Sequence, residues 1–126
     1  MTLQICKKDY NTLETLINNQ NTSISFRDKK LLSSELSKMT IIENADLPDD
    51  VVKLNSKVIV MDEARQTKIE LRITLPAQAN MREKKVSILA PISIALLGVS
   101  KHQVVEWKMP GGIKSLKILD VINDLK

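Results

Sequence analysis

The spacing of the hydrophobic residues changes partway along the chain, and this change limits the possible folds more than any other feature of the sequence. Up to about residue 39 apolar residues recur every three or four positions, as Leu13, Leu16 and Ile17 do, which is typical of amphipathic helices. From about residue 57 they alternate with polar residues, most clearly over residues 69–75, which is typical of a strand with one buried face. A helical part followed by a strand part predicts an α+β fold.

The helical part is predicted to form two short helices. Asp9 is expected as the N-cap of the first, and the second carries Leu32 and Leu36 on one face. Residues 18–25, between the helices, read NNQNTSIS, a polar break rich in Asn and Ser. We therefore expect a short antiparallel helical hairpin over residues 1–46.

The strand part, residues 47–126, contains five segments with strand character. They comprise residues 57–60, 69–75, 86–89, 104–109 and 116–122. Residues 62–66 are expected to form a charged loop between the first two segments. We expect a strongly bent antiparallel sheet, with one short helix over residues 91–97 laid on it.

Proline and glycine residues mark the places where the backbone is predicted to turn. Pro91 suits the first turn of the short helix, and Gly98 suits its C-terminal cap. The turn before the last strand is marked by three consecutive residues, Pro110, Gly111 and Gly112. Glycine adopts positive φ at little cost, so the glycines are expected to serve backbone geometry and not ligand binding.

The composition limits the classes of function. The sequence has one cysteine, Cys6, and one histidine, His102, so we expect neither an internal disulfide nor a metal site. The first residues lack the apolar core of a signal peptide, and no uncharged apolar run approaches the ~18 residues of a membrane span. We therefore expect a soluble, cytoplasmic protein.

The charge balance is weakly basic, with a net charge of +4. This charge is compatible with an acidic surface on a protein partner. The lysines are dispersed along the sequence, and aromatic residues that could stack on bases make up only 2% of it. We expect no direct sequence-specific contact with nucleic acid and no contact with a membrane.

The order of four motifs resembles a known family. Residues 89–98 read LAPISIALLG and residues 104–122 read VVEWKMPGGIKSLKILDVI, which is similar to the C-terminal domain of the GreA/GreB transcript-cleavage factors. Upstream, KKDYNTLETLI and LPDDVVKLNSKV are similar to the opening, the linker and the first strand of the Rnk-type regulators of nucleoside diphosphate kinase. The motifs cover most of the chain, which looks most like the Rnk-type members.

The resemblance implies an FKBP-like C-terminal domain behind a helical hairpin. It also implies docking at the rim of the RNA polymerase secondary channel, against a coiled-coil element of the β′ subunit. The matching contact positions are four consecutive residues, Leu89, Ala90, Pro91 and Ile92. An exposed apolar corner would suit such an interface, because a few buried anchors carry most of the affinity of a protein complex. Alternatively, these residues only pack the short helix onto the sheet.

The predicted hairpin is too short for transcript cleavage. In the cleavage factors a long hairpin ends in acidic residues that help to hold a metal ion at the polymerase active site. Here a first helix over residues 9–19 would span only ~16 Å, and the NNQNTSIS tip has no carboxylate to attract a hard cation. We expect a monomeric, non-enzymatic regulator that competes with cleavage factors and has no catalytic residue, metal or cofactor.

One alternative function remains open, a peptidyl-prolyl isomerase or chaperone, because one fold can host unrelated functions. Isomerase pockets of the FKBP-like fold are lined by aromatic residues. This sequence has three aromatic residues, Tyr10, Phe26 and Trp107. The first two fall in the predicted hairpin, so the sequence favours the polymerase-binding regulator.

Overall fold

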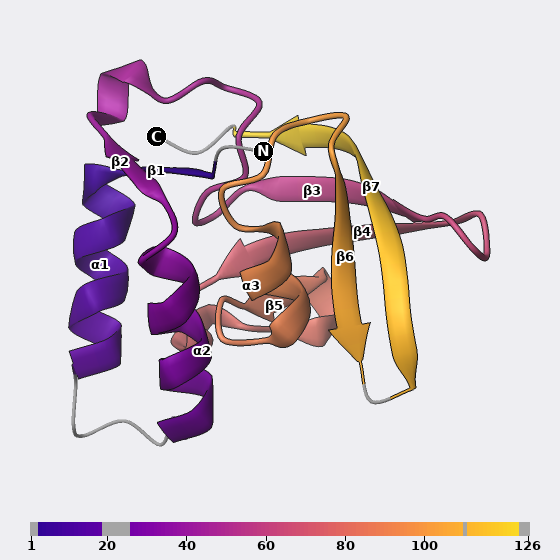
Figure 1. Cartoon of the computed structure of the whole chain (residues 1–126), viewed down its shortest axis with the longest axis horizontal. Coiled ribbons are helices and arrows are strands. Elements are labelled where there is room, and N and C mark those ends of the chain that lie inside the picture. Colours follow the sequence, from indigo (N-terminus) through magenta and orange to yellow (C-terminus); the bar gives the residue numbers. More distant parts are fainter. Residues whose placement is uncertain (1–2, 19–25, 110, 124–126) are drawn as a thin grey trace.

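A helical hairpin lies beside a strongly bent five-stranded sheet, and a short helix packs between them (Figure 1). This computed structural model describes residues 3–18, 26–109 and 111–123. The hairpin consists of α1 (Lys7–Asn18) and α2 (Phe26–Leu36). The predicted α+β class is confirmed, while the NNQNTSIS tip after Asn18 lies outside the described residues.

The sheet is built from the second part of the chain, and its strands follow the order β5-β4-β3-β7-β6. Their bounds are β3 Lys57–Asp62, β4 Thr67–Thr74, β5 Lys85–Ser87, β6 Val104–Met109 and β7 Gly112–Ile122. Each predicted strand segment overlaps one of these strands. The predicted short helix is α3, Pro91–Leu96.

One pair of strands departs from the predicted antiparallel arrangement. β3 pairs antiparallel with β4 and with β7, and β7 pairs antiparallel with β6, but β4 and β5 are parallel. After β4 the chain returns along the edge of the sheet through two 3-10 helices, η2 (Pro76–Gln78) and η3 (Met81–Glu83). β5 therefore runs in the same direction as β4. The alternation of side chains predicts which face a residue occupies, but not the direction of the neighbouring strand.

Two further short strands are not predicted by the sequence. β1 (Gln4–Cys6) precedes α1, β2 (Thr40–Ile42) follows α2, and the two form a parallel pair. The N–H of Thr40 also donates to the carbonyl of Leu3 at 2.9 Å. The segment before the hairpin and the segment after it are therefore hydrogen-bonded to each other, and this pairing fixes the base of the hairpin.

The hairpin and the sheet share one hydrophobic core. Leu13 of α1 and Leu32 of α2 are fully buried and belong to the same cluster as the inner residues of the strands. The fully buried residues that the five-stranded sheet contributes to this cluster are Val58, Val60, Ile73, Leu116 and Ile118. Because its apolar face is covered in this way, the described part of the hairpin is packed onto the remainder of the protein.

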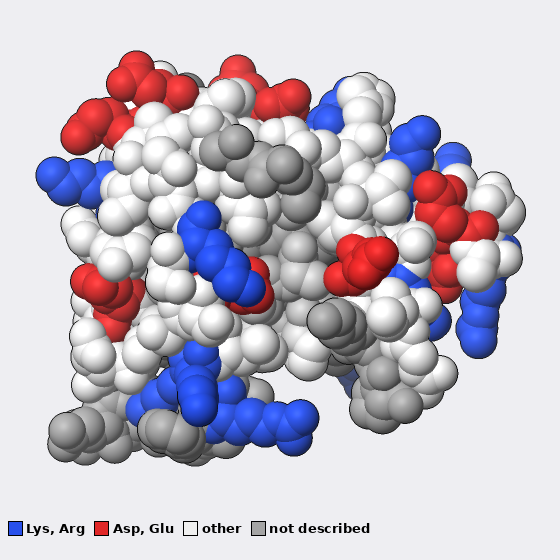
Figure 2. All heavy atoms as spheres, in the orientation of Figure 1, with Lys and Arg blue, Asp and Glu red and all other residues white. Residues whose placement is uncertain are grey.

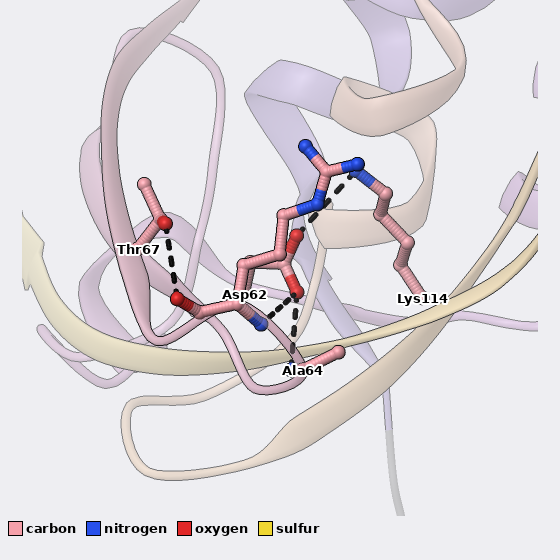
Figure 3. Close-up of polar contacts among 5 residues, drawn as sticks. Asp62, Ala64, Thr67 and Lys114 are labelled. Atoms are coloured by element: carbon pink, nitrogen blue, oxygen red, sulfur yellow. Dashed lines mark hydrogen bonds and ion pairs between the residues drawn. The ribbon is translucent and has the colours of Figure 1, made fainter.

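Asp62 stabilises the turn between β3 and β4 (Figure 3). Its buried carboxylate accepts hydrogen bonds from the backbone N–H of Ala64 (3.2 Å) and of Arg65 (3.4 Å), and its other oxygen lies 3.4 Å from Nζ of Lys114. Burial acts to raise the pKa of Asp62, but the N–H of Arg65, the ammonium of Lys114 and the N–H of Ala64 together hold that pKa below its ordinary value. The predicted charged loop is thus a turn organised by one carboxylate, which also contacts β7.

The first turn of α1 is capped by a residue other than the predicted one. The N–H of Lys8 donates to Oδ1 of Asn44 at 3.0 Å, and Asn44 begins the 3-10 helix η1 (Asn44–Asp46). Asp9, the predicted N-cap, instead lies inside the helix and is buried. The prediction is wrong because the acceptor is 36 positions away from the donor. A capping pattern is read from neighbouring residues, so it cannot identify such a distant acceptor.

Candidate functional site

The four predicted contact residues lie where the chain turns from β5 into α3. Oγ of Ser87 accepts a hydrogen bond from the N–H of Leu89 at 3.1 Å, and the carbonyl of Ser87 accepts one from the N–H of Ala90 at 3.0 Å. This tight turn places Pro91 in the first turn of α3, where the missing N–H of proline costs nothing.

Part of this corner faces the solvent. Leu89 is buried, with 8% of its surface exposed, whereas Pro91 is exposed and Ala90 and Ile92 are half-buried. Ile92 also packs against the hydrophobic core. The apolar surface of the corner is therefore narrower than the sequence predicts, because it consists of Pro91 with parts of Ala90 and Ile92.

The inner face of α3 anchors the corner to the sheet. Ser93, Ile94 and Leu96 are buried, and so is Leu97 directly after the helix. The helix lies against β6 and also contacts α2. Packing thus accounts for Ile94, Leu96 and Leu97, whereas Pro91 remains exposed.

Gly98 joins three segments at one point. Its N–H donates to the carbonyl of Val52 at 2.9 Å, and its carbonyl accepts from the N–H of Gln4 at 3.3 Å. Its φ is +82°, and a Cβ at this position would lie 3.1 Å from the carbonyl oxygen of Gln4. Only glycine suits this close, left-handed arrangement without strain, so Gly98 fixes the end of α3 against β1 and the connector before β3.

The second predicted turn connects β6 to β7. Its Gly112 lies opposite Met109 in the register of the two strands and has a φ of +134°. A Cβ on Gly111 would meet no atom within 4 Å. Pro110 lies outside the described residues. The backbone of Gly112 therefore needs glycine, while the surroundings of Gly111 do not.

A buried carboxylate holds the base of the hairpin against the remainder of the protein. Oδ2 of Asp9 accepts a hydrogen bond from the N–H of Leu54 at 3.0 Å. Burial raises the pKa of Asp9, and the hydrogen bonds from Leu54 and from the thiol of Cys6 oppose this effect. Burial also raises the pKa of the Cys6 thiol. Sequence reasoning misses this contact, because no local pattern links residues that are 45 positions apart.

The described end of the hairpin nearest the tip carries basic side chains (Figure 2). The sequence at the start of α2 has three basic residues and one acidic residue, Arg27, Asp28, Lys29 and Lys30. Acidic side chains gather instead over the connector that follows β2, at Glu43, Asp46, Asp49 and Asp50. The charge near the tip is thus opposite in sign to that expected of a metal-holding hairpin.

The described residues offer no metal-binding cluster. Among them, no group of three or more His, Cys, Asp and Glu side chains could hold a metal ion. His102 is an exposed turn residue with a φ of +75°. In the same part of the chain, no helix has the length and apolar character needed to cross a membrane.

The C-terminal part of the chain matches a family of transcription factors. The sequence model of the family described as "Transcription elongation factor, GreA/GreB, C-term" matches residues 47–123. The transcription elongation factor GreA of Rickettsia bellii (strain OSU 85-389) is 32% identical over 92 residues, which are 73% of this chain and 57% of that protein. GreA of Clostridium botulinum (strain Eklund 17B / Type B) is 31% identical over 99 residues, 77% of this chain and 62% of that protein. The chain therefore spans less than two thirds of the length of these relatives.

Solved structures share the fold. The prokaryotic transcription elongation factor GreA/GreB from Nitrosomonas europaea superposes with a TM-score of 0.77 and 29% identity, over 98% of this chain and 99% of that chain. Gfh1 of Thermus aquaticus has a TM-score of 0.55 and 18% identity, over 97% of this chain and 99% of that one, and shares the fold alone. With the family match over residues 47–123 and GreA relatives above 30% identity, the chain belongs to the GreA/GreB transcription elongation factor family.

Proposed function

We propose that this chain binds RNA polymerase and regulates transcription elongation without stimulating transcript cleavage. In this proposal its C-terminal domain, residues 47–126, docks at the rim of the secondary channel against a coiled-coil element of the β′ subunit. The short hairpin occupies the channel mouth, so the protein competes with cleavage factors for this site. The relatives are named transcription elongation factors, which supports the polymerase as the partner.

The short hairpin is the observation that carries the non-cleaving role. α1 has 12 residues, a length of about 18 Å. The tip sequence NNQNTSIS contains no carboxylate, and basic residues follow it in α2. A hard divalent cation needs charged oxygen ligands. This tip has no carboxylate that could help to hold a metal ion at the polymerase active site.

The corner before α3 supports the docking mode. Pro91 is exposed beside the half-buried Ala90 and Ile92, and the turn at Ser87 and the buried face of α3 hold this corner in place. A rigid apolar anchor loses little conformational entropy on binding. A few such anchors can carry most of the affinity of a protein interface.

Two measurements test the proposal. Binding to core RNA polymerase is measured by interferometry, with a GreA cleavage factor as competitor, and transcript cleavage is measured in stalled elongation complexes. We expect saturable binding that the competitor displaces, and cleavage at the rate of the polymerase alone. Stimulated cleavage would refute the non-cleaving role. A folded sample that does not bind the polymerase would refute the docking.

The isomerase or chaperone alternative has less support. Ile94 and Leu96 of α3 are buried against the sheet, and Trp107 is half-buried and packs against the same core. These side chains therefore serve packing. A protease-coupled prolyl isomerisation assay measures this activity directly, and we expect the uncatalysed rate.

A further inference from the structure

Ser87 is the last residue of β5, and its side chain forms a hydrogen bond within the turn that leads into α3. Its Oγ accepts the N–H of Leu89 at 3.1 Å, and its carbonyl accepts the N–H of Ala90 at 3.0 Å. A serine hydroxyl that bonds to the backbone two residues further on stabilises a turn. One residue therefore holds two consecutive backbone N–H groups of the corner.

Other contacts hold the turn on both sides of Leu89. Before it, Ile88 is fully buried, and its N–H donates to the carbonyl of Thr74 on β4 at 2.7 Å. After it, the carbonyl of Ala90 accepts the N–H of Ile94 in the first turn of α3 at 3.1 Å. The N–H of Leu89 itself bonds to the serine hydroxyl. This bond therefore links the part of the corner that is fixed to the sheet with the part that begins α3.

The start of α3 lacks a capping side chain. Ala90 occupies the N-cap position, with a φ of −67° and a ψ of 141°, and makes no side-chain capping bond. Alanine is a poor N-cap because its side chain has no oxygen to accept an N–H, and Pro91 has no N–H to donate. Within residues 87–92, all of which the structure describes, the bond to Oγ of Ser87 is the only side-chain hydrogen bond.

We propose that Ser87 is a positioning residue for docking, because its hydroxyl holds the corner in the conformation that presents Pro91 to the partner. This inference rests on the proposed docking at the corner. Without the hydroxyl, the corner populates other conformations, and the affinity falls with the fraction of molecules in the docking conformation. Fewer molecules are then competent when they meet the partner, so the loss falls on the association rate.

The experiment measures association and dissociation rates with core RNA polymerase by interferometry. Ser87→Ala should raise the Kd about fivefold, which corresponds to the loss of one hydrogen bond. The change should lie in the association rate, and the dissociation rate should equal that of the wild type. Ser87→Thr should restore the wild-type rates, because threonine keeps the accepting oxygen and suits a strand.

Ser37→Ala is the matched control. Oγ of Ser37 donates to the carbonyl of Ser34 at 2.7 Å, directly after α2 and outside the corner. This variant also loses one serine hydroxyl and one hydrogen bond, so a general effect of lower stability would be seen in it as well. Thermal unfolding of all variants is measured alongside. We expect Ser37→Ala to bind the polymerase like the wild type.

A second readout uses the free protein and does not involve the polymerase. Amide hydrogen exchange of the 15N-labelled full chain is followed by NMR. In Ser87→Ala the exchange of the Leu89 amide should be about fivefold faster than in the wild type, because the same hydrogen bond is lost. In Ser37→Ala it should be unchanged. This readout tests whether the hydroxyl orders the corner, independently of docking.

Four results would overturn the inference. Faster exchange with unchanged binding in Ser87→Ala would show that docking does not need an ordered corner, while the docking itself would stand. Unchanged exchange would show that the hydroxyl does not order the corner. Weaker binding that Ser87→Thr does not restore, or that Ser37→Ala shares, would mean that the hydrogen bond is not its cause. A folded wild-type protein that does not bind would refute the docking itself, and this inference with it.

Discussion

The carboxylate of Asp9 accepts a hydrogen bond of 3.0 Å from the backbone N–H of Leu54, a residue 45 positions further along the chain. Both residues are buried, with 7% and 8% of their surfaces exposed. A buried backbone donor needs a partner, and here the partner comes from the first turn of α1. This contact fixes the base of the hairpin onto the connector that leads into β3.

Removing this acceptor should destabilise the protein. Asp9→Ala leaves the N–H of Leu54 buried without a partner, which costs about 1–3 kcal/mol of unfolding free energy. Urea unfolding followed by circular dichroism measures the loss. Asp9→Asn is the matched control, because its side-chain oxygen can still accept the bond. If the Ala variant were as stable as the Asn variant, the hydrogen bond would not contribute.

The same pair of residues predicts a dependence on pH. Burial raises the pKa of Asp9 in the folded protein, and this effect exceeds the opposing hydrogen bonds from Leu54 and Cys6. The folded state therefore binds a proton more readily than the unfolded state. The stability that Asp9 contributes is fully present below its unfolded pKa of about 3.9 and is lost as the pH rises through the raised folded pKa.

Asp9→Asn removes this titration and should therefore gain stability relative to the wild type as the pH rises. The measured quantity is the difference in unfolding free energy between variant and wild type, taken from urea curves between about pH 3.5 and pH 7. We expect the difference to shift in favour of the variant over this range. A difference that stays constant with pH would mean that the pKa of Asp9 is not raised by folding.

Hydrophobic spacing predicts the elements that bury one face. The alternation over residues 69–75 corresponds to β4, Thr67–Thr74, and Pro91 begins the predicted short helix. Burial of every second residue is a local property of a strand, so the sequence of the strand itself carries the signal. The direction of a strand has no such local signal. The parallel pairing of β5 with β4 depends instead on the path that residues 75–84 take between the two strands.

Contacts between distant segments leave no such local signal. Asn44 caps α1 across 36 positions, and β1 pairs with β2 only after the hairpin has brought them together. At the corner, too, the sequence alone does not predict which apolar residues are exposed. Leu89 is apolar in sequence like Ile92, but the turn at Ser87 directs Leu89 inward and leaves it buried. The family motif predicts the position of the corner, and the tertiary fold decides which of its residues face the solvent.

A methyl group at Gly98 should destabilise the contact between the base of the hairpin and the C-terminal part. In Gly98→Ala the new Cβ lies 3.1 Å from the carbonyl oxygen of Gln4, and the backbone φ of +82° is strained for alanine. We expect a loss of about 1–3 kcal/mol in unfolding free energy. Gly111→Ala is the control, because a Cβ there meets no atom within 4 Å. Equal stability of the two variants would show that the contact with Gln4 is not tight.

A carboxylate at the corner should abolish the proposed docking. Pro91→Asp replaces an exposed apolar residue by a charge, and a charge buried in an interface without a partner is strongly unfavourable. We expect the Kd for core RNA polymerase to rise more than about tenfold. Ile92→Asp should have a similar effect, but Ile92 also packs against the core, so its thermal unfolding must be measured alongside.

Ile113→Asp provides the control for these corner variants. Ile113 is also an exposed apolar residue, but it belongs to β7 and not to the corner, and 62% of its surface is exposed. It receives the same charge, so a general effect of added negative charge on polymerase binding would be seen in it as well. Loss of binding with Pro91→Asp but not with Ile113→Asp would assign docking to the corner. Equal binding by both variants would mean that the partner contacts another surface, because Pro91 can be changed without disturbing the buried face of α3.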